Sequence, residues 1–276
     1  MQTRIEDCAY PAGSVRKTVI GRPWLLTILL ASALCLAYML AAFVHWGDVA
    51  DRSLYANLGM IPIGLVAAIL VGKAAANQPK RRGVWAWRIL AAGLACFWAG
   101  DVLYFFYQNV LAVSPFPSPA DAGYLAYYPL VFAGLLCFPH KPARYLLRVL
   151  AYPACLVLTA AGAIPVLVWF LLPTLQSAHD GLFAYSLSVG YPLGDILLLA
   201  GITWLLLRGA GTNRWSMWLL GVGLVIGLVA DVLFGHESIQ NTLQSGGLPD
   251  VGYMLSWTAF AWAGFAEVTR AQGSGR

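Results

Sequence analysis

Eight long runs of apolar residues constrain the fold of this chain more than any other feature of its sequence. A helix that crosses the hydrocarbon core of a bilayer needs about 20 mostly apolar residues, and each run meets or approaches that length. The runs cover residues 24–46, 54–76, 84–107, 120–138, 145–172, 182–207, 215–235 and 251–268. The segments between them are short and rich in Gly, Pro and polar residues. The sequence therefore predicts an all-α integral membrane protein with eight transmembrane helices.

The composition excludes the common soluble classes. Hydrophobic residues make up 60% of the 276 residues and charged residues only 11%, whereas a soluble domain carries about 25% charged residues. A soluble protein of this length could not bury so much apolar surface. The five cysteines are isolated and form no cluster with histidine. The sequence therefore indicates neither a disulfide framework nor a metal site, and no cofactor is expected.

The basic residues predict the orientation of the helices. Lys and Arg collect in the cytoplasmic loops of membrane proteins. If the N-terminus is cytoplasmic, all 17 Lys and Arg residues except Arg52 lie on the cytoplasmic side. We therefore expect a cytoplasmic segment at 1–22, a cytoplasmic tail at 269–276 and a multi-pass protein of the inner (plasma) membrane. The basic composition then reflects topology and contact with the lipid bilayer rather than nucleic-acid binding.

The two halves of the chain resemble each other, which predicts an internal repeat over residues 23–139 and 140–268. Each half contains four expected helices, an even number, so both halves have the same orientation. This arrangement predicts two parallel four-helix repeats related by a pseudo-two-fold axis along the membrane normal. At an offset of 130 residues the matched pairs are Tyr55 with Tyr185, Pro62 with Pro192, Gly64 with Gly194, Trp85 with Trp215, Gly93 with Gly223 and Asp101 with Asp231. At an offset of 129 they are Asp121 with Asp250, Gly123 with Gly252 and Tyr124 with Tyr253.

Acidic residues inside the apolar runs are the first candidates for a site, because such groups face a bundle interior or a water-filled cavity. Asp101 and Asp231 lie in the outer third of the third and seventh helices. They could form structural hydrogen bonds between helices or bind a ligand. Each is expected to contact the start of the following helix, near Tyr124 or Tyr253, in an outward-facing polar pocket.

Three further acids have different positions. Asp121 and Asp250 begin the fourth and eighth helices, where a carboxylate also stabilises the free N–H groups of the helix terminus. Asp195 lies in the middle of the sixth helix and matches Leu65 in the first half. Because a mid-membrane acid is costly, we favour a functional role for Asp195 and expect it to approach one of the two pockets.

Aromatic residues accompany these acids. The candidate tyrosines near them in the sequence are Tyr104, Tyr124, Tyr128, Tyr191 and Tyr253. They could line a pocket for a flat or cationic ligand, or belong to the core and the interfacial belt.

Two prolines lie in the middle of expected helices. Pro62 and Pro192 each remove a backbone N–H and are expected to kink the second and sixth helices. Such a kink could form a hinge or a cavity. It could equally serve packing alone, since proline is tolerated in membrane helices.

Three segments resemble the multi-span N-terminal region of bacterial, chiefly actinobacterial, membrane-bound GGDEF and GGDEF–EAL proteins. They are residues 98–104 (WAGDVLY), 117–129 (PSPADAGYLAYYP) and 191–199 (YPLGDILLL). The resemblance covers about residues 54–268. It implies a sensory input for a cytoplasmic domain that makes or degrades cyclic di-GMP. No GGDEF or EAL motif occurs in the sequence, so neither activity is carried over and the chain is not expected to be an enzyme.

The sequence thus favours a membrane-embedded sensory or ligand-binding module. Its polar and aromatic pocket would face the extracytoplasmic side and take a small ligand. Its expected partners are a cytoplasmic signalling domain or protein, and a second copy of the chain is compatible with this role. A small transporter is the first alternative, because of the parallel repeats, the prolines and Asp195. An integral-membrane enzyme that uses the clustered carboxylates is the second, although no nucleophile or metal set accompanies them.

The predicted topology can be tested by cysteine labelling. Residues 77–83 and 139–144 are expected to be cytoplasmic. A Gln78→Cys variant should therefore resist an impermeant thiol reagent added to intact cells and react once the cells are opened. Labelling in intact cells would contradict the predicted orientation.

Overall fold

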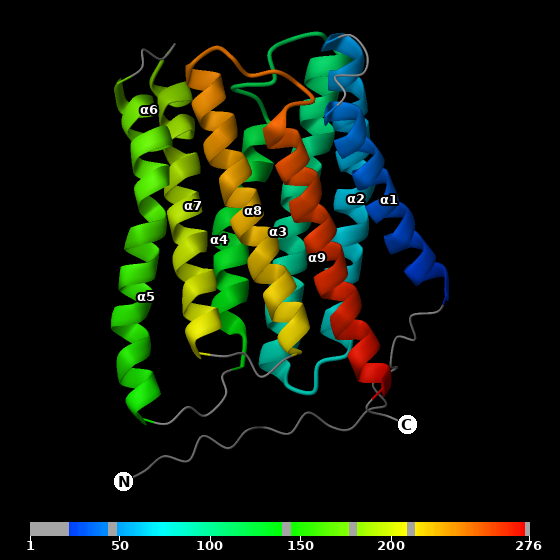
Figure 1. The fold of residues 1–276 in the computed structure, drawn as a ribbon, viewed down its shortest axis with the longest axis vertical. Helices are drawn as coiled ribbons and strands as arrows, with labels where there is room; N and C mark the ends of the chain where they lie inside the picture. The colour runs from blue at the N-terminus through cyan, green and yellow to red at the C-terminus, as the bar shows by residue number, and fades with distance from the viewer. Residues whose placement is uncertain (1–21, 44–48, 140–144, 177–180, 209–212, 274–276) are drawn as a thin grey trace.

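The computed structural model describes residues 22–43, 49–139, 145–176, 181–208 and 213–273. Within these ranges every regular element is helical, and the long helices run side by side in one bundle (Figure 1). Residues 1–21 of the expected cytoplasmic segment, the expected loop at 140–144, and residues 274–276 of the tail lie outside the described residues.

The first half of the chain forms four long helices close to the expected limits. The third helix continues into a π-helical segment, Phe106–Val110, so it extends beyond its expected end. The helices are α1 (Arg22–Phe43), α2 (Val49–Ala76), α3 (Arg81–Phe105) and α4 (Ala120–Cys137).

The fifth expected helix is divided into three consecutive segments. Its π-helical part begins directly after Pro165, a residue that lacks an N–H group and disturbs the regular hydrogen-bond ladder. The segments are α5 (Tyr145–Pro165), the π-helix Val166–Leu171 and α6 (Leu172–Gln176). They are followed by α7 (Leu182–Arg208), α8 (Arg214–Ile239) and α9 (Leu248–Gly273).

Seven helical segments in the described part of the chain are long and apolar enough to cross a membrane, judged by length and composition. The protein is therefore an all-α multi-pass membrane protein. The eighth expected span is a helix of full length, since α9 has 26 residues and extends past its expected end at 268. It is not among the seven apolar segments. It contains Asp250, Glu267 and Arg270 and many less hydropathic Gly, Ala and Trp residues.

The helices differ in how much of their surface the bundle covers. α9 packs against α8, α2 and α1, α3 packs along α4, and α7 contacts both α4 and α5. By contrast, α1 and α5 lie at the edges of the bundle (Figure 1). Their outward faces are apolar, with Leu30 70% exposed on α1 and Leu156 73% exposed on α5. Leucine-rich outward faces of this kind suit contact with lipid.

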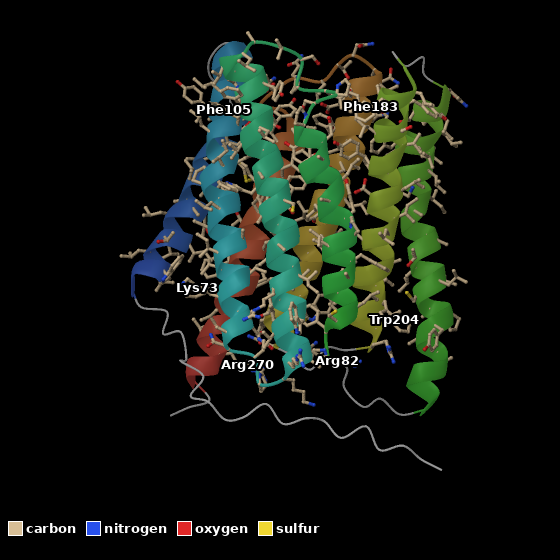
Figure 2. All side chains as sticks on the ribbon, turned by 180° about the vertical axis from the view of Figure 1, so that it is seen from behind. Lys73, Arg82, Phe105, Phe183, Trp204 and Arg270 are labelled. Atoms are coloured by element: carbon tan, nitrogen blue, oxygen red, sulfur yellow. The ribbon has the colours of Figure 1, made fainter. Side chains whose placement is uncertain are left out.

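The bundle has a basic end and an acidic end. Lys73, Arg82 and Arg270 lie toward one end, and Phe105 and Phe183 lie toward the other (Figure 2). We call the end with the three basic residues the basic end. α1 begins there and α9 ends there (Figure 1). At the opposite, acidic end, α4 and α9 begin with Asp121 and Asp250 in their first turns.

The basic end alters the design of the labelling test. Gln78 is only 9% exposed, and its side-chain amide donates to the Ala74 carbonyl and to Glu267. A cysteine at this position would be hidden from a reagent on either side of the membrane. Lys80 is exposed in the same turn between α2 and α3, so a Lys80→Cys variant reports the orientation without that ambiguity.

Glycine allows the closest helix contacts. A Cβ atom added to Gly123 in α4 would lie 2.6 Å from the carbonyl oxygen of Cys96 in α3. A Cβ atom added to Gly194 in α7 would lie 2.5 Å from the ring of Tyr128 in α4. Small residues at such crossings let membrane helices approach until their backbones touch.

We predict that Gly123→Ala weakens the α3–α4 contact, because the new methyl group would collide with backbone atoms that cannot rotate away. Overpacking of this kind costs about 1–3 kcal/mol, so the purified variant should unfold at a lower temperature in detergent. Gly72→Ala is the matched control, since its Cβ would lie 3.6 Å from that of Ala91, an ordinary contact. Equal melting temperatures for the two variants would contradict the prediction.

Candidate functional site

Residues on five helices bring the predicted acids and tyrosines together in the acidic half of the bundle. We call this group the acidic–aromatic cluster. It comprises Asp101 and Tyr104 on α3, Asp121, Tyr124 and Tyr128 on α4, Tyr191 and Asp195 on α7, Asp231 on α8, and Asp250 and Tyr253 on α9.

Two equivalent hydrogen bonds tie each membrane acid to the following helix. The hydroxyl of Tyr124 on α4 donates to Oδ1 of Asp101 on α3 at 3.1 Å. The hydroxyl of Tyr253 on α9 donates to Oδ1 of Asp231 on α8 at 2.7 Å. The contact expected from the sequence between each acid and the start of the next helix is therefore confirmed.

Two further hydrogen bonds connect the first half of the chain to the second. The hydroxyl of Tyr128 on α4 donates to Oδ2 of Asp231 on α8 at 3.4 Å. The hydroxyl of Tyr191 on α7 donates to Oδ1 of Asp121 on α4. Asp231 thus accepts from tyrosines of both halves, and the four hydrogen bonds join five helices: α3, α4, α7, α8 and α9.

The two acids at helix starts also serve their own backbone. Oδ2 of Asp121 accepts from the backbone N–H of Ser118 at 2.7 Å, and Oδ2 of Asp250 accepts from the backbone N–H of Gly246 at 2.5 Å. Both carboxylates therefore order the loop that enters their helix. Asp121 combines this local role with its bond to Tyr191. Tyr104 lies near both acids.

Asp195 is the least satisfied member of the cluster. Its side chain is 1% exposed, and within the described part of the chain its Oδ2 has no hydrogen-bond partner. Asp231 and Tyr128 are the polar groups that face it. The expectation that Asp195 approaches one of the two Asp–Tyr pairs is confirmed, and the pair it approaches is that of the second half.

Asp195 and Pro192 on α7 are buried, whereas the residues that match them on α2 are exposed. Leu65, the counterpart of Asp195 on α2, is 40% exposed. Pro62 on α2 is exposed, whereas Pro192 on α7 is buried. Both prolines lie inside continuous helices, and a hinge role for them stays a prediction. α2 and α7 therefore present different faces to the bundle.

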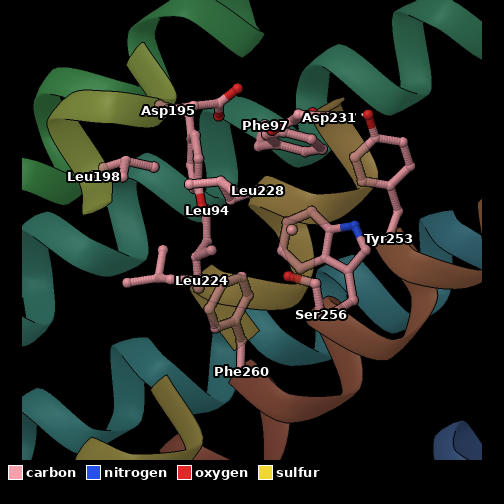
Figure 3. Close-up of a pocket in the computed structure, with 13 residues that line it drawn as sticks. Leu94, Phe97, Asp195, Leu198, Leu224, Leu228, Asp231, Tyr253, Ser256 and Phe260 are labelled. Carbon is pink, nitrogen blue, oxygen red and sulfur yellow. Dashed lines mark hydrogen bonds between the residues drawn. The ribbon is translucent and has the colours of Figure 1, made fainter. Parts of the chain in front are cut away.

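A narrow cavity lies between Asp195 and Asp231 and continues toward the interior of the bundle (Figure 3). Aromatic side chains supply much of its wall, and no Lys, Arg or His residue lines it. The free space is enough for about one ordered water molecule. The aromatic lining residues are Phe97, Tyr127, Tyr253, Trp257 and Phe260.

A second buried polar group, which our sequence analysis did not predict, lies at the basic end around Glu267. Glu267 on α9 is 5% exposed. Its Oε1 accepts from the Gln78 amide at 3.0 Å, and its Oε2 accepts from the Asn213 backbone N–H at 3.2 Å. Asn213 also caps α8, where its Oδ1 accepts from the Trp215 N–H at 3.1 Å. The one available signal was an acidic residue near the end of the last apolar run.

Comparison of the chain with protein-family models, with curated proteins and with solved structures finds no match. The fold and composition define the class, an all-helical multi-pass membrane protein, and the acidic–aromatic cluster is its most distinctive site.

We predict that Tyr253→Phe destabilises the protein, because Oδ1 of Asp231 would lose its shortest hydrogen bond in a buried setting. Hydrogen bonds between membrane helices contribute about 0.6–1.7 kcal/mol. A loss of this size should appear as a lower melting temperature of the purified protein. Tyr55→Phe is the control, since Tyr55 is 57% exposed. If both variants melt with the wild type, the Tyr253–Asp231 bond has no structural role.

Proposed function

We propose that this protein is a membrane sensory module that binds a small cationic solute at the acidic–aromatic cluster. Binding of the solute would regulate a cytoplasmic signalling domain or protein of the cyclic di-GMP type. The observation that carries the proposal is the concentration of five carboxyl groups among tyrosines inside a helical bundle. In the described residues the hydrogen-bond donors to these groups are tyrosine hydroxyls and backbone amides.

The chemistry of the cluster favours a cation. Carboxylates without basic partners create a negative potential, which a low-dielectric surrounding strengthens. Aromatic faces attract cations as well, and the ring of Phe97 lies 4.9 Å from that of Tyr124 and 5.5 Å from that of Trp257. An anionic solute would meet repulsion here, and a neutral solute would leave the negative potential uncompensated.

The distribution of charge supports an extracytoplasmic position for the cluster. The basic end carries Lys73, Arg82 and Arg270 (Figure 2), and basic residues favour the cytoplasmic side. The acidic end would then face outward. α1 begins and α9 ends at the same end of the bundle (Figure 1). An even number of crossings has this result, which supports eight crossings with α9 as the eighth.

Contacts at matched positions support two parallel repeats. Gly64 packs on Trp257, and its counterpart Gly194 packs on Tyr128, which matches Trp257 at the offset of 129. In the first contact a glycine of the first half meets an aromatic residue of the second half, and in the second contact the halves are exchanged. A two-fold axis relates contacts in this way. The Tyr124–Asp101 and Tyr253–Asp231 bonds match within the halves.

α9 is suited to transmit a signal along the bundle. It carries Asp250 and Tyr253 at the acidic end and Glu267 near the basic end. Because Glu267 bonds to the segments that precede α3 and α8, a shift of α9 would reach two further helices. The resemblance of residues 98–129 and 191–199 to GGDEF-associated sensory regions supports the same role.

A transporter is the alternative function with an observation in its favour. Asp195 lies near the middle of α7 beside an internal cavity, and transporters use buried acids of this kind along their substrate pathways. Transport requires the solute to cross the bundle, whereas sensing requires only binding, so the two functions can be separated by experiment.

We predict that choline, used as a probe cation, raises the melting temperature of the full chain in detergent, and that its neutral analogue 3,3-dimethyl-1-butanol does not. Asp101→Asn, which removes the carboxylate beside Tyr124, should weaken choline binding about tenfold, which corresponds to ~1.4 kcal/mol. Glu237→Gln, an acid of the same end outside the cluster, should leave it unchanged. Equal shifts with choline and the neutral analogue would contradict a cation site. Uptake of labelled choline into proteoliposomes would favour the transporter.

A further inference from the structure

Asp195 and Asp231 form a pair of facing carboxyl groups that solute binding does not explain. The two carboxyl groups come from adjacent helices, α7 and α8, and face each other across the upper part of the cavity (Figure 3). Asp231 accepts from the hydroxyls of Tyr253 and Tyr128. Oδ2 of Asp195 has no such donor and is buried. Asp231 is thus stabilised as a carboxylate by two hydrogen bonds, whereas Oδ2 of Asp195 has no hydrogen bond that would stabilise a negative charge.

Two ionised carboxylates are unfavourable in this position. Like charges in contact repel strongly where water is excluded. Among the described residues, the titratable groups that face the pair are tyrosines, and none supplies a positive charge: Tyr127 and Tyr128 on α4, Tyr191 on α7 and Tyr253 on α9. α3 contributes only Leu94 and Phe97 to the cavity wall. A cation must therefore compensate one of the two negative charges.

The size and ligand set of the cavity select that cation. The space holds about one water molecule, so an organic cation does not fit between the two groups. A metal cation needs several oxygen ligands, and no group of three or more His, Cys, Asp or Glu side chains in the described residues could hold one. Most of the side chains that line the cavity are aliphatic or aromatic. A proton needs only one oxygen to carry it and one to accept from it.

We propose that Asp195 and Asp231 form a binding site for a single exchangeable proton in the centre of the bundle. The proton is carried on Asp195, whose O–H donates to the carboxylate of Asp231. When it leaves for water, two negative charges face each other and α7 and α8 are driven apart. The first half has no such site, because the residue that matches Asp195 is Leu65, 40% exposed on α2. The proton site shares Asp231 with the acidic–aromatic cluster, but the proton binds whether or not a cationic solute is bound.

The full chain, purified without any added solute, allows a direct test by infrared spectroscopy. The wild type should show the C=O stretching band of a protonated carboxylic acid at neutral pH, and the band should shift in D₂O and disappear at alkaline pH. Asp195→Asn should remove the part of the band that Asp195 contributes, while any contribution from Asp101, whose Oδ2 is also buried without a partner, should remain. Asp121→Asn, which alters an acid with partners on both oxygens, should leave the band in place. A missing band in the wild type, or an unchanged band in Asp195→Asn, would overturn the proposal.

A second variant decides the question even if Asp195→Asn does not fold. Tyr128→Phe removes a hydroxyl that faces both Asp195 and Asp231 and stabilises the state in which both are ionised, so a higher pH should be needed to remove the proton. The expected result is a shift of the titration midpoint to higher pH, and an unchanged midpoint would contradict the site.

The same titration in sodium and in potassium salts tests whether Na⁺ competes with the proton for the site. Loss of the band on adding sodium at constant pH would assign the site to Na⁺ and overturn the proton assignment. None of these readouts depends on choline binding, so this inference and the proposed function can fail separately.

Discussion

A carboxyl group inside a membrane must find its hydrogen-bond partners within the protein, and much of this bundle is organised around that requirement. No water is available in the hydrocarbon region, so Asp101 and Asp231 each bind to a neighbouring helix. Asp101 joins α3 to α4 through Tyr124, and Asp231 joins α8 to α9 through Tyr253. The bonds from Tyr128 to Asp231 and from Tyr191 to Asp121 then connect the two halves. The groups that stabilise the helix arrangement are therefore the same groups that form the candidate site.

The second half has a polar group that the first half lacks. Asp195 is buried against Asp231, whereas its counterpart Leu65 lies 40% exposed on α2. One half can therefore serve mainly as scaffold while the other carries a site that responds to protons. The cavity has room for only about one water molecule and its wall is largely aromatic, so the local dielectric is low, which increases the energetic effect of a single proton.

Much of the fold could be predicted from the sequence, because the length of an apolar run and the spacing of its acids are local properties. The helix limits and the contacts of Asp101 with Tyr124 and of Asp231 with Tyr253 follow from such patterns. Other features depend on helix rotation. Trp87 looks like an interfacial residue in the sequence, yet it is fully buried in edge-to-face contact with Phe138. Gln78 lies in an expected loop but is buried against Glu267, 189 residues later in the chain.

The sequence by itself determined that the chain is a helical membrane protein, how many long helices it forms and which acids are too costly to face lipid, because hydropathy acts residue by residue. Only the tertiary structure decided which acids meet. Asp195 and Asp231 are 36 residues apart in sequence and belong to different helices, and their contact depends on how α7 rotates against α8. The close approach of α4 to α3 and α7, set by Gly123 and Gly194, places the tyrosines within reach of those acids. The sequence contains the glycines, but packing decides which backbone each of them allows to approach.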